Sequence, residues 1–165
     1  PSERLDDLRD ALVSRADPQT APELVLLFDE TAAPARLEAA RPWIDDAFAA
    51  DSVDEIIGRL RGRAEQEAHA TAELLETLPP TALAVTLAAV RAAREHDELR
   101  TVLAQEYGLV LWFATTQPDL VEGIRARLVD KDGAPSWSPG SRDDLAPDVV
   151  ARAFGFEPVP ALWTD

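Results

Sequence analysis

Apolar side chains recur at three- and four-residue spacing along most of the chain, and prolines separate one run from the next. The clearest start signal is Ser52-Val53-Asp54-Glu55, a capping-box pattern with Ser at the cap and Glu three residues later. Helical spacing then continues through Ile56, Ile57, Leu60, Ala64, Ala68, Ala72 and Leu75. We therefore predict one long helix over residues 52–75.

The same periodicity predicts further helices over residues 5–12, 43–48, 80–94, 97–115, 120–128 and 147–154. The run 24–28 is short enough to be a buried strand, but a first-turn proline at position 22 favours a helix. Residues 109–113 are apolar on all sides, so we expect this helix end to be buried on most sides. The prediction is an all-α chain of seven to eight helices.

The charge balance narrows the class of partner. The chain has 31 acidic and 16 basic residues, and its formal net charge is -15. Nucleic acids and anionic membranes bind Lys- and Arg-rich surfaces, so neither is an expected partner. Cysteine is absent, which excludes disulfides and thiol nucleophiles, and no apolar run is as long as a membrane span. These features favour a cytoplasmic protein.

Methionine is also absent, even at position 1. A complete translation product normally begins with methionine. We therefore expect the chain to be part of a longer protein.

Catalytic and metal-binding patterns are missing from the sequence. His69 and His96 are isolated from one another, and neither belongs to a zinc-binding motif, so no metal site is predicted. The adjacent acid pairs are expected on solvated faces, because successive helix residues do not face each other; these pairs are Asp6-Asp7, Asp45-Asp46 and Asp143-Asp144. We assign no catalytic residue in this chain.

One segment, residues 122–137, carries a candidate binding site. A helix with Arg125 and Arg127 ends at Lys131, the only lysine, and a turn-rich loop around Trp137 follows. A lysine at a helix end can contact a phosphate as a point charge. The alternative is a general preference for cations at helix C-termini, with Trp137 as a plug in the core and Asp130 and Asp132 neutralising the lysine.

The same segment resembles a known family. Glu-Gly-Ile-Arg-Ala-Arg-Leu-Val-Asp-Lys-Asp at 122–132, followed by Pro-x-Trp, is similar to the C-terminal signature of the 3-hydroxyisobutyryl-CoA hydrolase branch of the enoyl-CoA hydratase/isomerase (crotonase) superfamily. Three upstream stretches resemble that branch in the same order: 51–57, preceded by Trp-Ile-Asp at 43–45, then 78–87, and Glu-Tyr-Gly-Leu at 106–109. Pro79 departs from the pattern, where the branch has serine.

The resemblance implies a particular architecture. The chain would be the C-terminal helical part of a crotonase-type α/β spiral fold whose N-terminal half is absent. Residues 1–42 would join the spiral core to the C-terminal region, and residues 43–165 would form the C-terminal helical domain. In the superfamily the absent half carries the oxyanion-hole loop and the catalytic carboxylates, so the isolated chain is expected to be inactive.

The resemblance also implies a function. The whole enzyme would hydrolyse a short 3-hydroxyacyl-CoA thioester such as 3-hydroxyisobutyryl-CoA, with coenzyme A as part of the substrate and no covalently bound cofactor. This half would cover the acyl pocket and contact coenzyme A through Lys131 and Arg125. Its partners would be the N-terminal half, the acyl-CoA and, in a homo-oligomer, a neighbouring subunit. Two alternatives stay open: hydratase or isomerase activity on the same scaffold, and a non-enzymatic helical interaction module.

Overall fold

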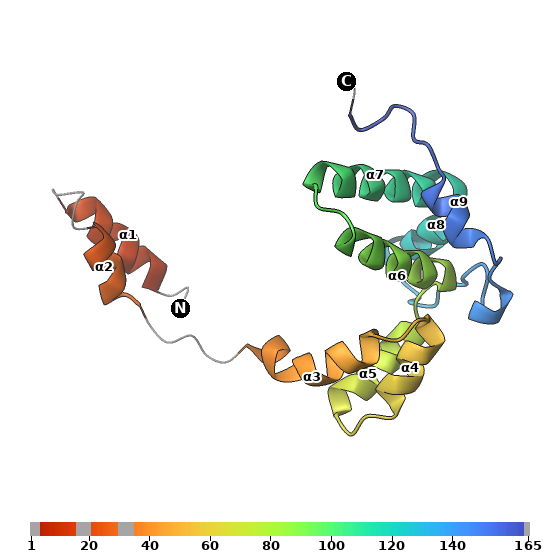
Figure 1. Ribbon diagram of the computed structural model, residues 1–165, viewed down its shortest axis with the longest axis horizontal. Coiled ribbons are helices and arrows are strands. Elements are labelled where there is room, and N and C mark those ends of the chain that lie inside the picture. Colours follow the sequence, from red (N-terminus) through yellow and green to blue (C-terminus); the bar gives the residue numbers. More distant parts are fainter. Residues whose placement is uncertain (1–3, 16–20, 30–34, 164–165) are drawn as a thin grey trace. The chain divides into compact units, whose positions relative to one another are not determined.

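The computed structural model describes residues 4–15, 21–29 and 35–163 (Figure 1). Residue contacts divide the chain into two compact units, Pro1–Pro42 and Trp43–Asp165. Each unit is described by itself below. All regular elements in the described residues are helical, which confirms the predicted all-α class.

The first unit contains two short helices, α1 (Leu5–Ser14) and α2 (Ala21–Leu27), which contact each other. The run 24–28 is therefore mainly helical, as the first-turn proline favoured. Leu24 is buried, and the Arg4 guanidinium lies 4.8 Å from the centre of the Phe28 ring. Helix α3 (Arg36–Phe48) begins in this unit and ends in the second, with Pro42 inside it.

The predicted long helix over 52–75 is wrong, because the structure has two helices there. Helix α4 (Val53–Arg61) begins at the Ser52 cap, where the Ser52 hydroxyl accepts a hydrogen bond from the Glu55 backbone N–H. It ends at Gly62, and α5 (Gln66–Glu76) then packs back against it. The turn lets both helices bury their apolar stripes, and the described residues form nine α-helices where seven to eight helices were expected.

Polar contacts hold the turn between α4 and α5. Arg63 pairs with Glu65 at 3.1 Å and with Asp46 at 3.2 Å. A ring nitrogen of His69 lies 2.7 Å from the Arg63 carbonyl oxygen. An uninterrupted helix would have to give up this arrangement together with the packing of Leu60, which is fully buried.

The main core of the second unit lies between α6 (Pro80–Arg94), α7 (Leu99–Thr116) and α9 (Val149–Phe154) (Figure 1). Pro80 begins α6 at a position where a missing N–H costs nothing. Each of the three helices contributes two buried apolar residues to the core, namely Val85 and Ala89, Leu109 and Trp112, and Val149 and Ala153. The Trp112 and Phe113 rings meet edge to face, with centroids 4.9 Å apart.

Residues 109–113 of α7 are buried on most sides, as expected, and Val110 is the exception. Leu109 and Trp112 are buried, but Val110 is 60% exposed. The reason is positional: Leu109 and Trp112 face α6 and α9, whereas Val110 points to the opposite side of the helix.

The last elements surround the candidate site. Helix α8 (Asp119–Ile124) continues directly into a π-helical turn, Arg125–Val129. An irregular loop follows, with a 3₁₀ turn at Arg142–Asp144 before α9.

Within the described residues, no single helix has the length and apolar character to cross a membrane; α5 and α6 satisfy the test only together, with a bend of 119° between them.

Candidate functional site

The site centres on Arg125, which lies where α8 becomes the π-helical turn. Its guanidinium contacts three carboxylates: Glu122 at 2.8 Å, Asp130 at 2.7 Å and Asp132 at 2.7 Å. It also donates to the Ala134 carbonyl oxygen at 3.3 Å. We call these four charged residues the Arg125 cluster. The cluster ties the helix end to the loop that follows.

The cluster shifts the acidity of its members. The Arg125 guanidinium, together with the Ser136 backbone N–H, lowers the pKa of Glu122 to about 2. The Ala134 backbone N–H and then Arg125 lower the pKa of Asp132. Arg125 donates hydrogen bonds to Glu122, Asp132 and Asp130, and these bonds raise its pKa. Glu122 and Asp132 are therefore charged at neutral pH, and the cluster holds three carboxylates against one guanidinium.

The structure corrects one detail of the charge pattern. The sequence suggested that Asp130 and Asp132 neutralise Lys131, but their carboxylates contact Arg125 instead. The sequence shows acidic residues on both sides of Arg125, and these could have indicated its ion pairs. Only the π-helical turn, however, brings Asp130 and Asp132 back to Arg125.

Lys131 is exposed and makes no ion pair or hydrogen bond through its side chain with any described residue. Its backbone has φ of 56°, the left-handed conformation that usually ends a helix at glycine. Gly133, which has φ of 64°, donates its N–H to the Ala126 carbonyl oxygen at 3.1 Å and completes the helix end. Lysine thus occupies a backbone position whose conformation favours glycine.

The loop after Lys131 is fixed to the rest of the unit at Trp137 and Ser138. The Trp137 indole N–H donates to the Thr77 carbonyl oxygen at 2.8 Å, and its ring packs against the backbone of Gly123. The Ser138 N–H donates to Oδ1 of the buried Asp119 at 2.8 Å. Trp137 is half-buried and acts as an anchor between α5, α8 and the loop.

An apolar groove of about 580 Å³ lies beside this helix end, between α7 and α8. We call it the α7–α8 groove; its lining includes Val110, Phe113, Leu120, Ile124, Arg127 and Leu128. Several of these side chains are strongly exposed, with Leu128 at 68%. The groove therefore leaves an extended apolar surface in contact with solvent.

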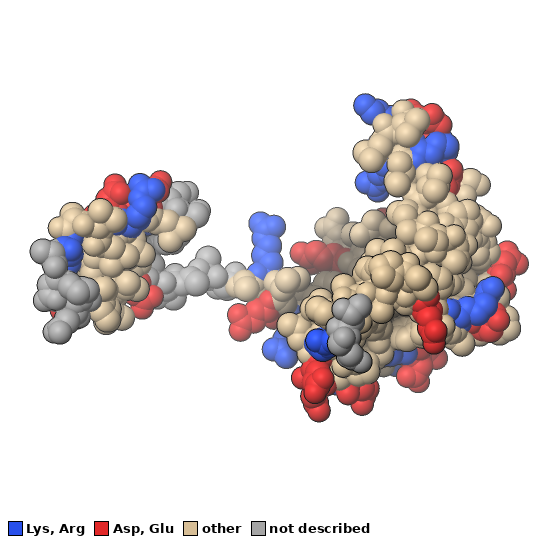
Figure 2. Space-filling view, turned by 90° about the horizontal axis from the view of Figure 1, so that it is seen from above, with Lys and Arg blue, Asp and Glu red and all other residues tan. Residues whose placement is uncertain are grey.

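Other candidate residues do not gather into a site. His69 is exposed on α5, and His96 is exposed in the joint between α6 and α7. No group of three or more potential metal ligands occurs in the part of the chain that the structure describes. The acid pairs 6–7, 45–46 and 143–144 lie on exposed surface. On the face displayed in Figure 2, basic side chains are scattered among acidic ones and form no continuous basic patch.

Comparison with known proteins identifies the family. The model of the enoyl-CoA hydratase/isomerase family matches residues 1–154. The chain therefore belongs to this family, and the resemblance to the crotonase superfamily seen in the sequence is confirmed.

Relatives and solved structures agree with this assignment. The chain is 29% identical over 161 residues to the mitochondrial 3-hydroxyisobutyryl-CoA hydrolase of Danio rerio, matching 93% of the chain and 41% of the relative. It is 34% identical over 117 residues to the small ribosomal subunit protein mS47 of Arabidopsis thaliana, matching 67% of the chain and 28% of the relative. A carnitinyl-CoA dehydratase structure from Mycobacterium thermoresistibile matches with a TM-score of 0.82 and 30% identity.

The chain covers less than half the length of each of these relatives. The dehydratase structure is matched over 99% of this chain and 45% of that chain. An enoyl-CoA hydratase structure from Rhodobacter sphaeroides 2.4.1 gives a TM-score of 0.78 at 30% identity, with 99% and 46% coverage. The helical fold described here is thus the fold of one part of these larger enzymes.

Proposed function

We propose that this chain is the C-terminal part of an acyl-CoA thioester hydrolase acting on a short 3-hydroxyacyl-CoA of the 3-hydroxyisobutyryl type. The similarity to a 3-hydroxyisobutyryl-CoA hydrolase over 93% of the chain carries this proposal. Hydrolysis adds water across the thioester and yields a carboxylic acid and the free thiol of coenzyme A. The acid–base groups and oxyanion donors would come from the N-terminal half of the enzyme.

In this proposal Lys131 contacts a phosphate of coenzyme A. Its ammonium group is exposed and unpaired among the described residues, so no existing ion pair has to be broken. A lysine in the left-handed backbone conformation costs free energy that a glycine would not cost. Such backbone strain is typical of positions where the side chain has a function.

Arg125 would take part in a different way from Lys131. Its guanidinium is already engaged by Glu122, Asp130 and Asp132. A phosphate would have to displace these carboxylates. We therefore infer that Arg125 positions the helix end and the backbone of Lys131, and that any contribution to coenzyme A binding is made through that backbone.

The α7–α8 groove would cover the N-terminal half and the acyl pocket. Its apolar lining is suited to excluding water from a thioester site. Burial of this surface in the whole enzyme would also remove its exposure to solvent.

The test uses the chain joined to, or coexpressed with, the N-terminal half. Hydrolysis of 3-hydroxyisobutyryl-CoA is followed by the appearance of free thiol. We expect thiol release from the combined protein and none from residues 1–165 alone. Absence of thiol release from a folded combined protein contradicts the proposal.

The Lys131 contact has its own test in the combined protein. Lys131→Gly relieves the left-handed backbone, so stability is expected to be equal or higher, while KM for acyl-CoA rises about tenfold with a smaller change in kcat. Lys131→Arg retains the charge and is expected to keep most of the affinity. An unchanged KM for Lys131→Gly would show that the side chain has no part in binding.

Hydratase activity is the second candidate. The two matching structures are named carnitinyl-CoA dehydratase and enoyl-CoA hydratase, and their TM-scores are 0.82 and 0.78. Loss of enoyl-CoA absorbance without thiol release by the combined protein would favour this activity. The remaining alternative is a non-enzymatic role, as the name of the Arabidopsis ribosomal relative suggests. This alternative predicts that neither reaction occurs.

The predicted cytoplasmic location remains a prediction, since the Danio rerio relative is named as mitochondrial.

A further inference from the structure

A second cavity lies on the other side of the unit's main core, along one face of α6. Its volume is about 180 Å³. Helix α6 contributes a single stripe at helical spacing, consisting of Leu83, Thr86, Leu87, Val90, Arg91 and Arg94. The opposite face of α6 carries Val85 and Ala89 into the core, so the stripe is not needed for that packing.

Helices α3, α4 and α5 complete this α6 cavity with apolar side chains. The opposing wall is formed by Phe48, Val53, Ile56 and Leu75. An apolar cavity of about 150 Å³ is large enough to hold one benzene ring. The α6 cavity can therefore take an apolar group of roughly six carbons.

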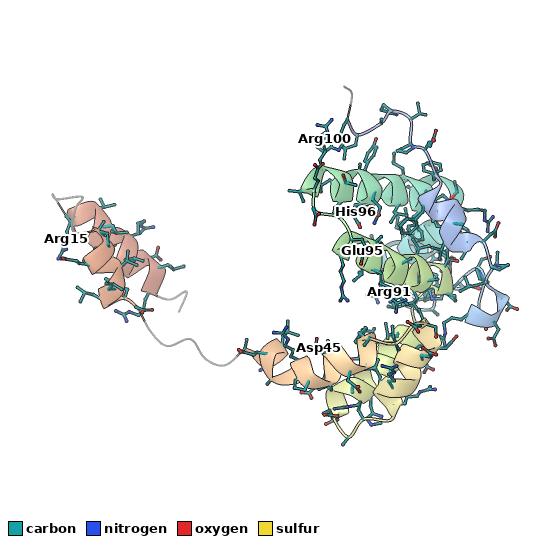
Figure 3. The ribbon with its side chains drawn as sticks, in the orientation of Figure 1. Arg15, Asp45, Arg91, Glu95, His96 and Arg100 are labelled. Atoms are coloured by element: carbon teal, nitrogen blue, oxygen red, sulfur yellow. The ribbon has the colours of Figure 1, made fainter. Side chains whose placement is uncertain are left out.

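Arg91 and Arg94 give one side of this cavity a positive charge. Arg91 donates to the carbonyl oxygens of Ala50 and Asp51, the latter at 2.8 Å, and so is held in place by neutral acceptors. Figure 3 shows Arg91 on α6, with Glu95 and His96 at the joint that follows. Arg94 is exposed and has no side-chain partner among the described residues.

The two guanidinium groups are not neutralised by ion pairs with carboxylates of the described residues. Both lie in the last turn of α6, where the helix end carries about half an elementary negative charge. Neither Arg91 nor Arg94 forms an ion pair with a carboxylate of the described residues, although the whole chain has a net charge of -15. Two uncompensated cations beside an apolar cavity favour an amphiphilic anion.

We propose that the α6 cavity binds a short-chain carboxylate, with the hydrocarbon tail between α6 and α4 and the carboxylate at Arg94 and Arg91. The inference stands independently of the proposed function, because this binding needs neither acyl-CoA nor hydrolysis. It concerns a site separate from Lys131, which lies at the end of the π-helical turn.

Hexanoate is the probe, and binding is followed on residues 1–165 by methyl NMR and calorimetry. We expect a Kd on the order of 1 mM, which is typical of such a small ligand. The methyl signals of Leu83, Leu87 and Val90 are expected to shift. Hexan-1-ol has the same tail without the charge and is expected to bind at least about fivefold more weakly.

Two variants and one control test the cavity and the charge separately. Arg94→Gln should raise the Kd for hexanoate about fivefold or more without affecting the fold, because Arg94 is exposed. Val90→Trp should fill the cavity from its rim and abolish binding; Val90 is 51% exposed, so the change is tolerated. The control is Arg152→Gln: Arg152 is an exposed arginine in the last turn of α9 that pairs with Asp148 at 3.4 Å and does not line the cavity, so the Kd should be unchanged.

The proposal is overturned if hexanoate leaves these methyl signals unmoved at concentrations well above the expected Kd. It is equally overturned if hexan-1-ol binds as tightly as hexanoate, because the cavity would then bind apolar groups without selecting for anions. Unchanged binding to a folded Val90→Trp variant would place the ligand elsewhere and overturn it too.

Discussion

Glu122 is the carboxylate of the Arg125 cluster whose pKa is lowered to about 2. It accepts from the Arg125 guanidinium at 2.8 and 2.9 Å and from the Ser136 N–H at 2.7 Å. These bonds stabilise its charged form, and the pKa falls from 4.5 to about 2. Glu122 therefore joins α8 to the loop after Lys131 by charge as well as by hydrogen bonds.

This shift predicts a pH dependence of stability. Below pH 4.5 the unfolded chain protonates Glu122, whereas the folded chain keeps it ionised down to about pH 2. The contribution of Glu122 is therefore complete above pH 4.5 and is lost as the pH falls toward 2. Urea unfolding at a series of pH values should show a shallower loss of stability in this window for Glu122→Gln.

Glu157→Gln is the matched control, because Glu157 is exposed in the tail and forms no ion pair with a described residue. Its stability profile should follow that of the unmodified chain. A carboxyl titration by NMR that places the midpoint of Glu122 at or above 4.5 would contradict the role given to Arg125.

At the level of single elements, α4 depends on Ser52, the residue that caps its N-terminus. The Ser52 hydroxyl accepts from the Glu55 N–H at 3.2 Å, and the Glu55 carboxylate accepts in turn from the Asp51 N–H at 2.9 Å. Because α4 has only nine residues, a large share of its backbone N–H groups lies in the first turn. The cap therefore matters more here than in a long helix.

Removing the cap should destabilise the second unit measurably. Ser52→Ala is expected to lower the free energy of unfolding by about 1 kcal/mol, and Ser52→Gly by only a few tenths. Ser52→Asp supplies another capping oxygen and should restore stability close to that of serine. Equal stabilities for the alanine and aspartate variants, measured by chemical denaturation, would contradict the cap.

At the scale of the whole molecule, the exposed apolar surface governs behaviour in solution. Val110 and Leu128, both in the α7–α8 groove, are 60% and 68% exposed. Extended apolar patches on a soluble chain promote association. Residues 1–165 alone are therefore expected to self-associate as concentration rises.

Charged substitutions in the groove should reduce this association. Val110→Glu and Leu128→Arg are expected to increase the monomer fraction in light scattering after size-exclusion chromatography. Val159→Glu is the control, because Val159 is 93% exposed and lies outside the groove. If the control reduces association as much as the groove variants, the groove is not the contact surface.

Local signals in the sequence were sufficient for most elements. The Ser52 cap, Pro80 at the start of α6 and the proline before α8 each act within one helical turn, so their effects are independent of the rest of the fold. The family resemblance likewise rested on short stretches in order along the chain. The helical class, the family and most helix positions were predictable for this reason.

Tertiary structure decided what depends on contacts between distant residues. The break at Gly62 follows from the packing of α5 against α4, and the outward direction of Val110 follows from where α6 and α9 cover α7. The carboxylates at 130 and 132 reach Arg125 only because a π-helical turn and a left-handed Lys131 bring the chain back. Sequence by itself determined most of the helical segments, because propensity and capping are local. Burial, ion pairing and the free charge of Lys131 depend on neighbours that only folding supplies.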